Sequence, residues 1–108
     1  MTIREIEQQV FHRIITEATA HGWELHSIDD GMDEWVCYSP EHAWEEATQL
    51  DEATIRFRKP GERGNKWQYA GVFVVFGNSG DDLITDYHTS LDAPMEAVAQ
   101  WIDNTFQP

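Results

Sequence analysis

Three segments of the chain carry apolar residues at helical spacing. The first is predicted from Thr2 to His21, with Thr2 and Glu5 at the spacing of a capping box and Gly22 as the residue that ends it. Its apolar side covers about half of the helix circumference, which is wide for a helix at a protein surface. This side consists of Ile3, Ile6, Val10, Phe11, Ile14, Ile15 and Ala18.

The width of this apolar side has two explanations. A well-buried helix is one, and packing against a second copy of the chain is the other. Glu7 falls inside the apolar side, where its carboxylate would lie in the first turn near the positive end of the helix.

The other two helices are predicted from their start signals and their spacing. Ser39 as N-cap and Pro40 as first helical residue begin a helix that runs to about Leu50. One side of it is apolar, and the opposite side carries Glu41, Glu45 and Glu52. Asp92 is expected to cap the last helix, which continues to about Phe106 with a narrow apolar stripe.

Five segments between the helices have the composition or alternation of strands. They are residues 23–28, 34–38, 53–58, 66–76 and 83–87, with turns at Asp29-Asp30-Gly31 and at Gly77–Gly80. Successive strands within each group are close enough for hairpins. We therefore expect one α+β domain over residues 1–108, a mostly antiparallel five-stranded sheet with helices packed on it in the order α-ββ-α-βββ-α.

Composition excludes several classes of protein. Of 108 residues, 20 are Asp or Glu and seven are Lys or Arg, a formal charge of −13, yet 41% hydrophobic and 12% aromatic residues predict a folded chain. Such a negative field repels nucleic acid and anionic membranes. No apolar stretch approaches the roughly 20 residues that cross a bilayer, and the first residues lack the apolar centre of a secretory signal. We expect a soluble, cytoplasmic protein of a bacterial cell.

The sequence offers little for catalysis or metal binding. The single cysteine, Cys37, lies in the middle of a predicted strand and is expected to be a buried structural thiol. His42 and Glu46 have a spacing that can hold a metal ion, and four acidic residues crowd positions 29–34, but neither group completes a known site. We expect no enzyme, no cofactor and no specific metal site.

The distribution of charge is the strongest functional signal. Residues 56–66 hold five basic residues and one acidic residue, a formal charge of +4, whereas the other 97 residues hold two basic and 19 acidic residues, a formal charge of −17. Such a surplus favours rapid association with a basic surface, although solubility alone is the simpler explanation. The candidate partner-binding residues are Asp29, Asp30, Asp33, Glu41, Glu45, Glu46, Asp51, Glu52, Asp81 and Asp82. A possible second contact is basic and consists of Arg56, Arg58, Lys59, Arg63 and Lys66.

One part of the chain resembles a known group of proteins. Residues 71–87 contain Phe76-Gly77-Asn78, Gly80, Asp82 and Asp86-Tyr87 in a pattern similar to that of small uncharacterised acidic proteins of phages and mobile elements. The Asp-Glu lead into the strand at 51–57 and the helix at 95–101 resemble the same group, over about residues 30–105. The resemblance implies a phage or mobile-element context, where small acidic proteins are often inhibitors of host defence, including anti-restriction and anti-CRISPR proteins.

Two functions from different classes follow. The first is an inhibitor whose acidic surface imitates nucleic acid and occupies a basic DNA- or RNA-binding site of a host defence nucleoprotein. The alternative is a non-enzymatic accessory interaction module that dimerises through the helix at 3–18, with its charge serving only solubility.

Overall fold

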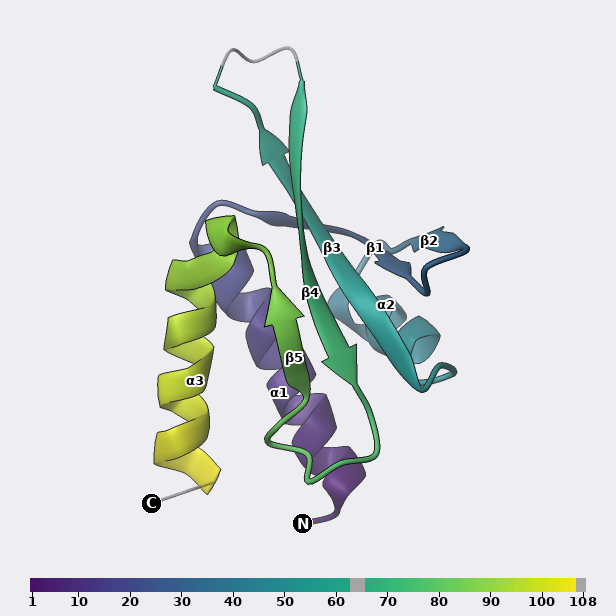
Figure 1. Ribbon diagram of the computed structural model, residues 1–108, viewed down its shortest axis with the longest axis vertical. Coiled ribbons are helices and arrows are strands. Elements are labelled where there is room, and N and C mark those ends of the chain that lie inside the picture. Colours follow the sequence, from purple (N-terminus) through teal and green to yellow (C-terminus); the bar gives the residue numbers. More distant parts are fainter. Residues whose placement is uncertain (63–65, 107–108) are drawn as a thin grey trace.

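The computed structural model describes residues 1–62 and 66–106, which form three α-helices and five strands (Figure 1). The helices are α1 (Ile3–Ala20), α2 (Pro40–Ala47) and α3 (Asp92–Phe106). The strands are β1 (Glu24–Asp29), β2 (Glu34–Val36), β3 (Glu52–Pro60), β4 (Trp67–Val75) and β5 (Ile84–Tyr87). The predicted α+β class and the order of its elements are confirmed.

The start signals of the first two helices form the predicted hydrogen bonds. The Thr2 hydroxyl accepts from the Glu5 N–H (3.1 Å), and the Glu5 carboxylate accepts from the Thr2 N–H (3.2 Å), which completes the capping box of α1. At α2, the Ser39 hydroxyl accepts from the His42 N–H (3.1 Å). Each bond satisfies a backbone donor that the first turn of a helix leaves unpaired.

Two predicted helix ends are wrong. The second helix ends at Ala47, so Glu52 is not on a helix face with Glu41 and Glu45 but is the first residue of β3. Asp92 does not cap α3, because a 3₁₀ turn at Thr89–Leu91 leads directly into the helix. His88 caps that turn, and its ring accepts from the Ser90 N–H (3.2 Å).

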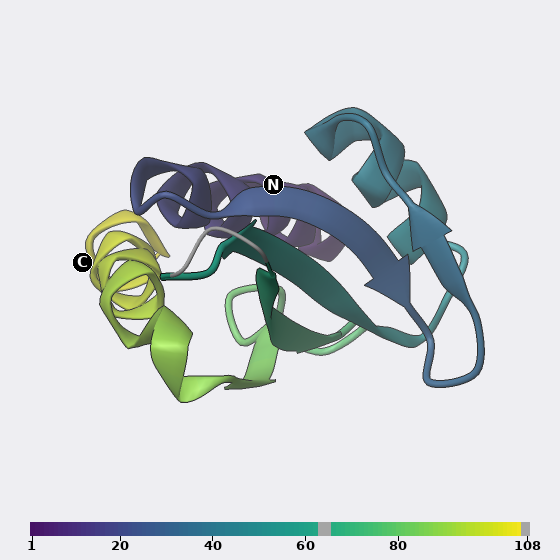
Figure 2. The same ribbon diagram turned by 90° about the horizontal axis from the view of Figure 1, so that it is seen from above.

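All neighbouring strands pair antiparallel in the order β2-β1-β3-β4-β5. The longest pairing joins β3 to β4, and their hairpin projects beyond the rest of the sheet (Figure 1). The three helices lie on one face, and seen from above α1 lies between α3 and α2 (Figure 2). Alternate strand residues therefore point into the core on this face, and no helix of the described residues covers the opposite face.

The apolar side of α1 forms the centre of the core. Val10, Phe11 and Ile14 are fully buried, and the helix packs against α3, α2 and β1. Burial within the single chain accounts for these positions of the wide apolar side, whereas Ile3 at its start is 48% exposed. Among the described residues, no helix is both long enough and apolar enough to span a membrane.

Candidate functional site

The structure divides the predicted acidic residues between two sides of the molecule. Those of α2, of the β1–β2 turn and of the start of β3 lie toward edge strand β2, because α2 packs against β1 and β3. Asp81 and Asp82 instead belong to the turn between β4 and β5, and Asp81 faces α3. Helices α2 and α3 flank opposite sides of α1 (Figure 2). Asp81 is therefore separated from the carboxylates of α2, whereas Asp51 and Glu52 lie at the end of the sheet where the β4–β5 turn begins.

In the β1–β2 turn, two of the three aspartates stabilise the turn itself. Asp30 accepts the backbone N–H groups of Asp33 (2.7 Å) and Met32 (2.9 Å), and these two bonds lower the pKa of the Asp30 carboxyl. Asp29 accepts the Gly31 N–H (2.6 Å), where the backbone has a positive φ that suits glycine. Aspartate is common in turns for this reason.

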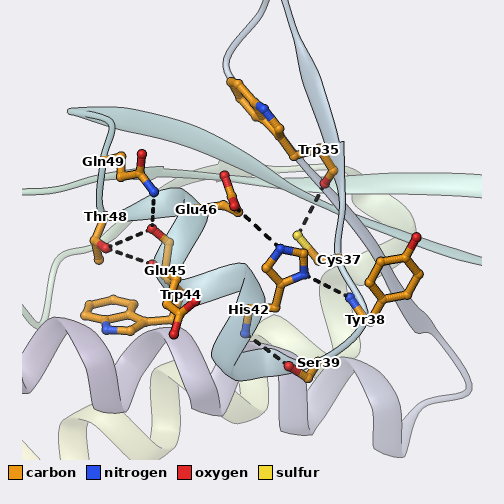
Figure 3. Close-up of polar contacts among 10 residues, drawn as sticks. All are labelled: Trp35, Cys37, Tyr38, Ser39, His42, Trp44, Glu45, Glu46, Thr48 and Gln49. Atoms are coloured by element: carbon orange, nitrogen blue, oxygen red, sulfur yellow. Dashed lines mark hydrogen bonds and ion pairs between the residues drawn. The ribbon is translucent and has the colours of Figure 1, made fainter.

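On α2, one of the three glutamates is also engaged within the chain. His42 accepts the Tyr38 N–H through Nδ1 (3.4 Å) and lies 3.5 Å from the Glu46 carboxylate through Nε2 (Figure 3). The His42 ring also stacks on Tyr38, with 6.0 Å between the ring centroids. Glu46 is half-buried beside this histidine, whereas Glu41 and Glu45 point into solvent.

Five exposed carboxylates on this side have no hydrogen-bonding or cationic side-chain partner among residues 1–62 and 66–106. They come from neighbouring elements and are the residues most available to another molecule. They are Asp33, Glu41, Glu45, Asp51 and Glu52.

Exposed apolar side chains also occur in the β1–β2 hairpin and just after it, and sequence reasoning missed them. Met32 is 93% exposed, Tyr38 87% and Val36 48%, although all three belong to or flank the edge hairpin of β1 and β2. Tyrosine and methionine are enriched in protein–protein interfaces. A signal was present, since Met32 is the one apolar residue in a turn of Asp and Gly. We call the five carboxylates together with Met32, Val36 and Tyr38 the β2-side surface.

The basic residues of the second candidate set are largely neutralised within the sheet. Arg56 lies 3.3 Å from Asp29 and 3.6 Å from Glu34, on the face without helices. Arg58 donates to Glu24 (2.5 Å), which raises the pKa of the arginine, and its guanidinium lies over the Trp67 ring. Opposite charges on adjacent strands stabilise the pairing of those strands.

The rest of the basic segment is less uniform. The Lys59 ammonium lies 4.4 Å from the centre of the Trp23 ring, a cation–π contact. Lys66 is exposed at the loop end of the β3–β4 hairpin, and Arg63 lies outside the described residues. The segment is therefore less available to a partner than its formal charge of +4 suggests.

The thiol of Cys37 is poorly suited to nucleophilic chemistry. It is buried, its Sγ donates to the Trp35 carbonyl (3.3 Å), and burial raises its pKa above the usual value (Figure 3). The reactive form of cysteine is the thiolate, which a raised pKa disfavours. In the described part of the chain, no group of three or more His, Cys, Asp or Glu residues is placed to hold a metal ion.

The turn between β4 and β5 also uses its acidic residues internally. Asp82 accepts the Ser79 N–H (3.1 Å), and Asp81 accepts the Ser79 hydroxyl (2.8 Å). Gly77 and Gly80 have positive φ, as the predicted tight turn requires. This turn packs closely against the start of α1. A Cβ atom added at Gly80 would lie only 2.9 Å from the Ile6 Cβ, so there is no room for a side chain at this position.

The face of the sheet without helices has a shallow hollow of about 560 Å³. Gly71 forms part of its floor, where the Thr54 methyl group leans over the glycine, and Phe73, Asp86 and His88 line its walls. Its polar groups can both donate and accept hydrogen bonds, so they do not define one class of ligand.

No protein-family model matches the chain, and searches of curated proteins and of solved structures find no match. The resemblance to proteins of phages and mobile elements accordingly stays a prediction from the sequence. The candidate site is defined by its own geometry.

Proposed function

We propose that this protein is a non-enzymatic inhibitor that docks its β2-side surface on a basic, nucleic-acid-binding surface of another protein. One observation carries the proposal: the β1–β2 hairpin, α2 and the start of β3 carry both unpaired carboxylates and exposed apolar side chains. The arginines of β3, in contrast, are paired within the chain. The molecule therefore presents unpaired carboxylates to its surroundings, whereas Arg56 and Arg58 are paired with carboxylates of the same chain.

The two kinds of side chain have different roles in such an interface. Carboxylates accelerate association with a basic partner and select its sign, but charge pairs at an exposed rim add little affinity. Apolar and aromatic residues at the centre supply most of the binding energy. Tyr38 and Met32 meet that requirement, since most of each side chain is in contact with solvent in the free protein.

The spacing of the carboxylates favours a nucleic-acid-binding partner. Glu41 and Glu45 are one helical turn apart, a rise of about 6 Å, and both are exposed. Rows of negative charge at such spacing can occupy lysines and arginines that otherwise contact phosphates. A host defence nucleoprotein is the target that the resemblance to phage and mobile-element proteins implies.

Competition with DNA tests this proposal. The immobilised protein is incubated with the heparin-binding fraction of a bacterial lysate, and each captured protein is then assayed for binding of a fluorescent duplex. We expect the wild-type protein to displace the duplex. The triple change Glu41→Gln, Glu45→Gln and Glu52→Gln should weaken displacement about tenfold. Each of these three charges at the rim of the interface contributes modestly to the binding free energy, and the three contributions add up.

A charge-matched control separates the surface from net charge. Glu62→Gln, Asp86→Asn and Asp92→Asn together remove the same charge from exposed positions outside the β2-side surface, and displacement should remain. Met32→Ser with Tyr38→Ser should weaken binding without reducing its salt dependence. If saturating protein leaves duplex binding unchanged, or if both triple variants behave alike, the proposal is wrong.

A further inference from the structure

A second opening lies between β5 and α3, on the other side of α1 from α2. It is a groove of about 350 Å³, within the range of about 300–1,000 Å³ typical of small ligand sites. Its floor is apolar and is formed by Ile84 and Tyr87 of β5 and by Met95 and Ile102 of α3. It is separate from the β2-side surface, with which it shares no residue.

The groove forms where a short strand meets a small side chain of the neighbouring helix. Strand β5 has only four residues and is the edge of the sheet, and Ala99 is the residue of α3 that faces the opening between Met95 and Ile102. These three helix residues follow one another at spacings of four and three, so they form one stripe along α3. Ala99 is exposed, and its single methyl group leaves the middle of the stripe unfilled.

Acidic side chains border this apolar stripe. Glu96 and Asp103 are seven residues apart on α3, so they lie on the same side of the helix, and both are exposed. Neither has a cationic partner within the described ranges, and Asp81 contributes a third carboxylate from the β4–β5 turn. Among the described residues, none that lines the groove is basic.

We propose that this groove binds an apolar side chain of a basic peptide segment, such as a leucine flanked by lysines or arginines. The apolar floor would take the side chain, and the bordering carboxylates would attract the flanking cations. An acidic or uncharged segment with the same leucine lacks that attraction. This site does not depend on the β2-side surface, so either proposal can fail alone.

Methyl NMR of the full chain tests the proposal. The probe is a short helical peptide of alanine and lysine that carries two leucines four residues apart. We expect it to shift the methyl signals of Ile84, Met95 and Ile102, and to bind more weakly as salt increases. The same peptide with glutamate in place of lysine should bind at least about tenfold more weakly.

Variants of α3 separate the groove from general attraction to an acidic protein. Ala99→Trp should abolish the methyl shifts because the indole fills the opening. Ala93→Trp is the matched control, since Ala93 is exposed on α3 but does not line the groove, and it should bind as the wild type does.

A peptide-side change gives an answer that does not depend on the folding of any variant. Replacing both leucines of the probe by alanine, with the wild-type protein, should remove the methyl shifts. The proposal is overturned if that peptide, or the glutamate peptide, shifts the same methyl groups equally. It is also overturned if the leucine-lysine peptide shifts none of them.

Discussion

Glu7 is the residue at which local pattern and tertiary structure diverge most. It interrupts the apolar side of α1, and only 2% of it is exposed. Its Oε2 accepts the Gly77 N–H at 2.7 Å, while Arg4 lies 3.8 Å from its other oxygen. The carboxylate thus fastens the β4–β5 turn to the first helix. Position near the helix start, the explanation available from sequence, does not account for this bond.

Replacing Glu7 by alanine should lower the free energy of unfolding by about 1–3 kcal/mol, because the hydrogen bond from the Gly77 N–H to the carboxylate is lost. Glu7→Gln should cost less, since the amide oxygen can still accept. Urea denaturation followed by circular dichroism measures both. The exposed Gln8 provides the control, and Gln8→Ala should lie within about 0.5 kcal/mol of the wild type. An equally small effect of Glu7→Ala would contradict the assigned role.

At the scale of elements, the β1–β2 turn shows how acidic residues can serve structure. The Asp30 carboxylate accepts first from the Asp33 N–H and also from the Met32 N–H, and its pKa is lowered in the folded state. A lowered pKa means that the folded state binds the proton less readily than the unfolded state. The stabilisation is therefore complete above the unfolded pKa of about 3.9 and is lost as the pH falls through the folded pKa.

This gives a pH prediction for the turn. In a carboxyl NMR titration, the Asp30 midpoint should lie below about 3.9. Asp30→Asn keeps an oxygen acceptor but removes the charge, so the stability of this variant should depend less on pH in the acid range. A midpoint at or above the ordinary value would show that the two backbone donors do not favour the charged form.

The elements themselves could largely be predicted, but their ends and neighbours less so. The capping box at Thr2 and the Ser39-Pro40 start depend on local hydrogen bonds, so sequence was sufficient for them. The pairing of β1 with β3 was not predicted, because residues far apart such as Ile28 and Ile55 meet only in the assembled sheet. The early end of α2 likewise moved Glu52 from a helix to a strand.

Only part of the candidate site could be predicted, because some of its features depend on neighbouring residues and others on residues far apart in the sequence. Exposure of Glu41 and Glu45 follows from helical period, which sequence shows. Whether a carboxylate is already paired depends on distant residues, as with Asp29 and Arg56. The exposure of Tyr38 could not be predicted either. The alternation of residues does not show that β2 is an edge strand, nor that it has only three residues.

At the scale of the whole molecule, which measures 44 × 28 × 21 Å, positive and negative side chains are distributed unevenly along the long axis. The β3–β4 hairpin carries Lys59 and Lys66 at one end (Figure 1). The start of β3 and the β4–β5 turn bring carboxylates to the other end of the sheet. With few free cations among these carboxylates, their mutual repulsion opposes the folded state.

Salt should therefore stabilise the protein. Raising NaCl from about 0.02 M to about 0.5 M shortens the screening length severalfold, so we expect Tm to rise by several degrees in calorimetry. The variant with Glu41→Gln, Glu45→Gln and Glu52→Gln should start from a higher Tm and rise less. A fall of Tm with salt would mean that ion pairs such as Arg58–Glu24 outweigh the repulsion.

The sequence by itself determined the helices, most strand segments, the turns and the sign of the charge, because these depend on neighbouring residues and on composition. Only the tertiary structure decided which charges remain available. It paired Arg56 and Arg58 across strands, buried Glu7 against Gly77, and separated Asp81 from the carboxylates of α2. The physical reason is that ion pairs and exposure depend on distances across the sheet, which the order of residues along the chain does not contain.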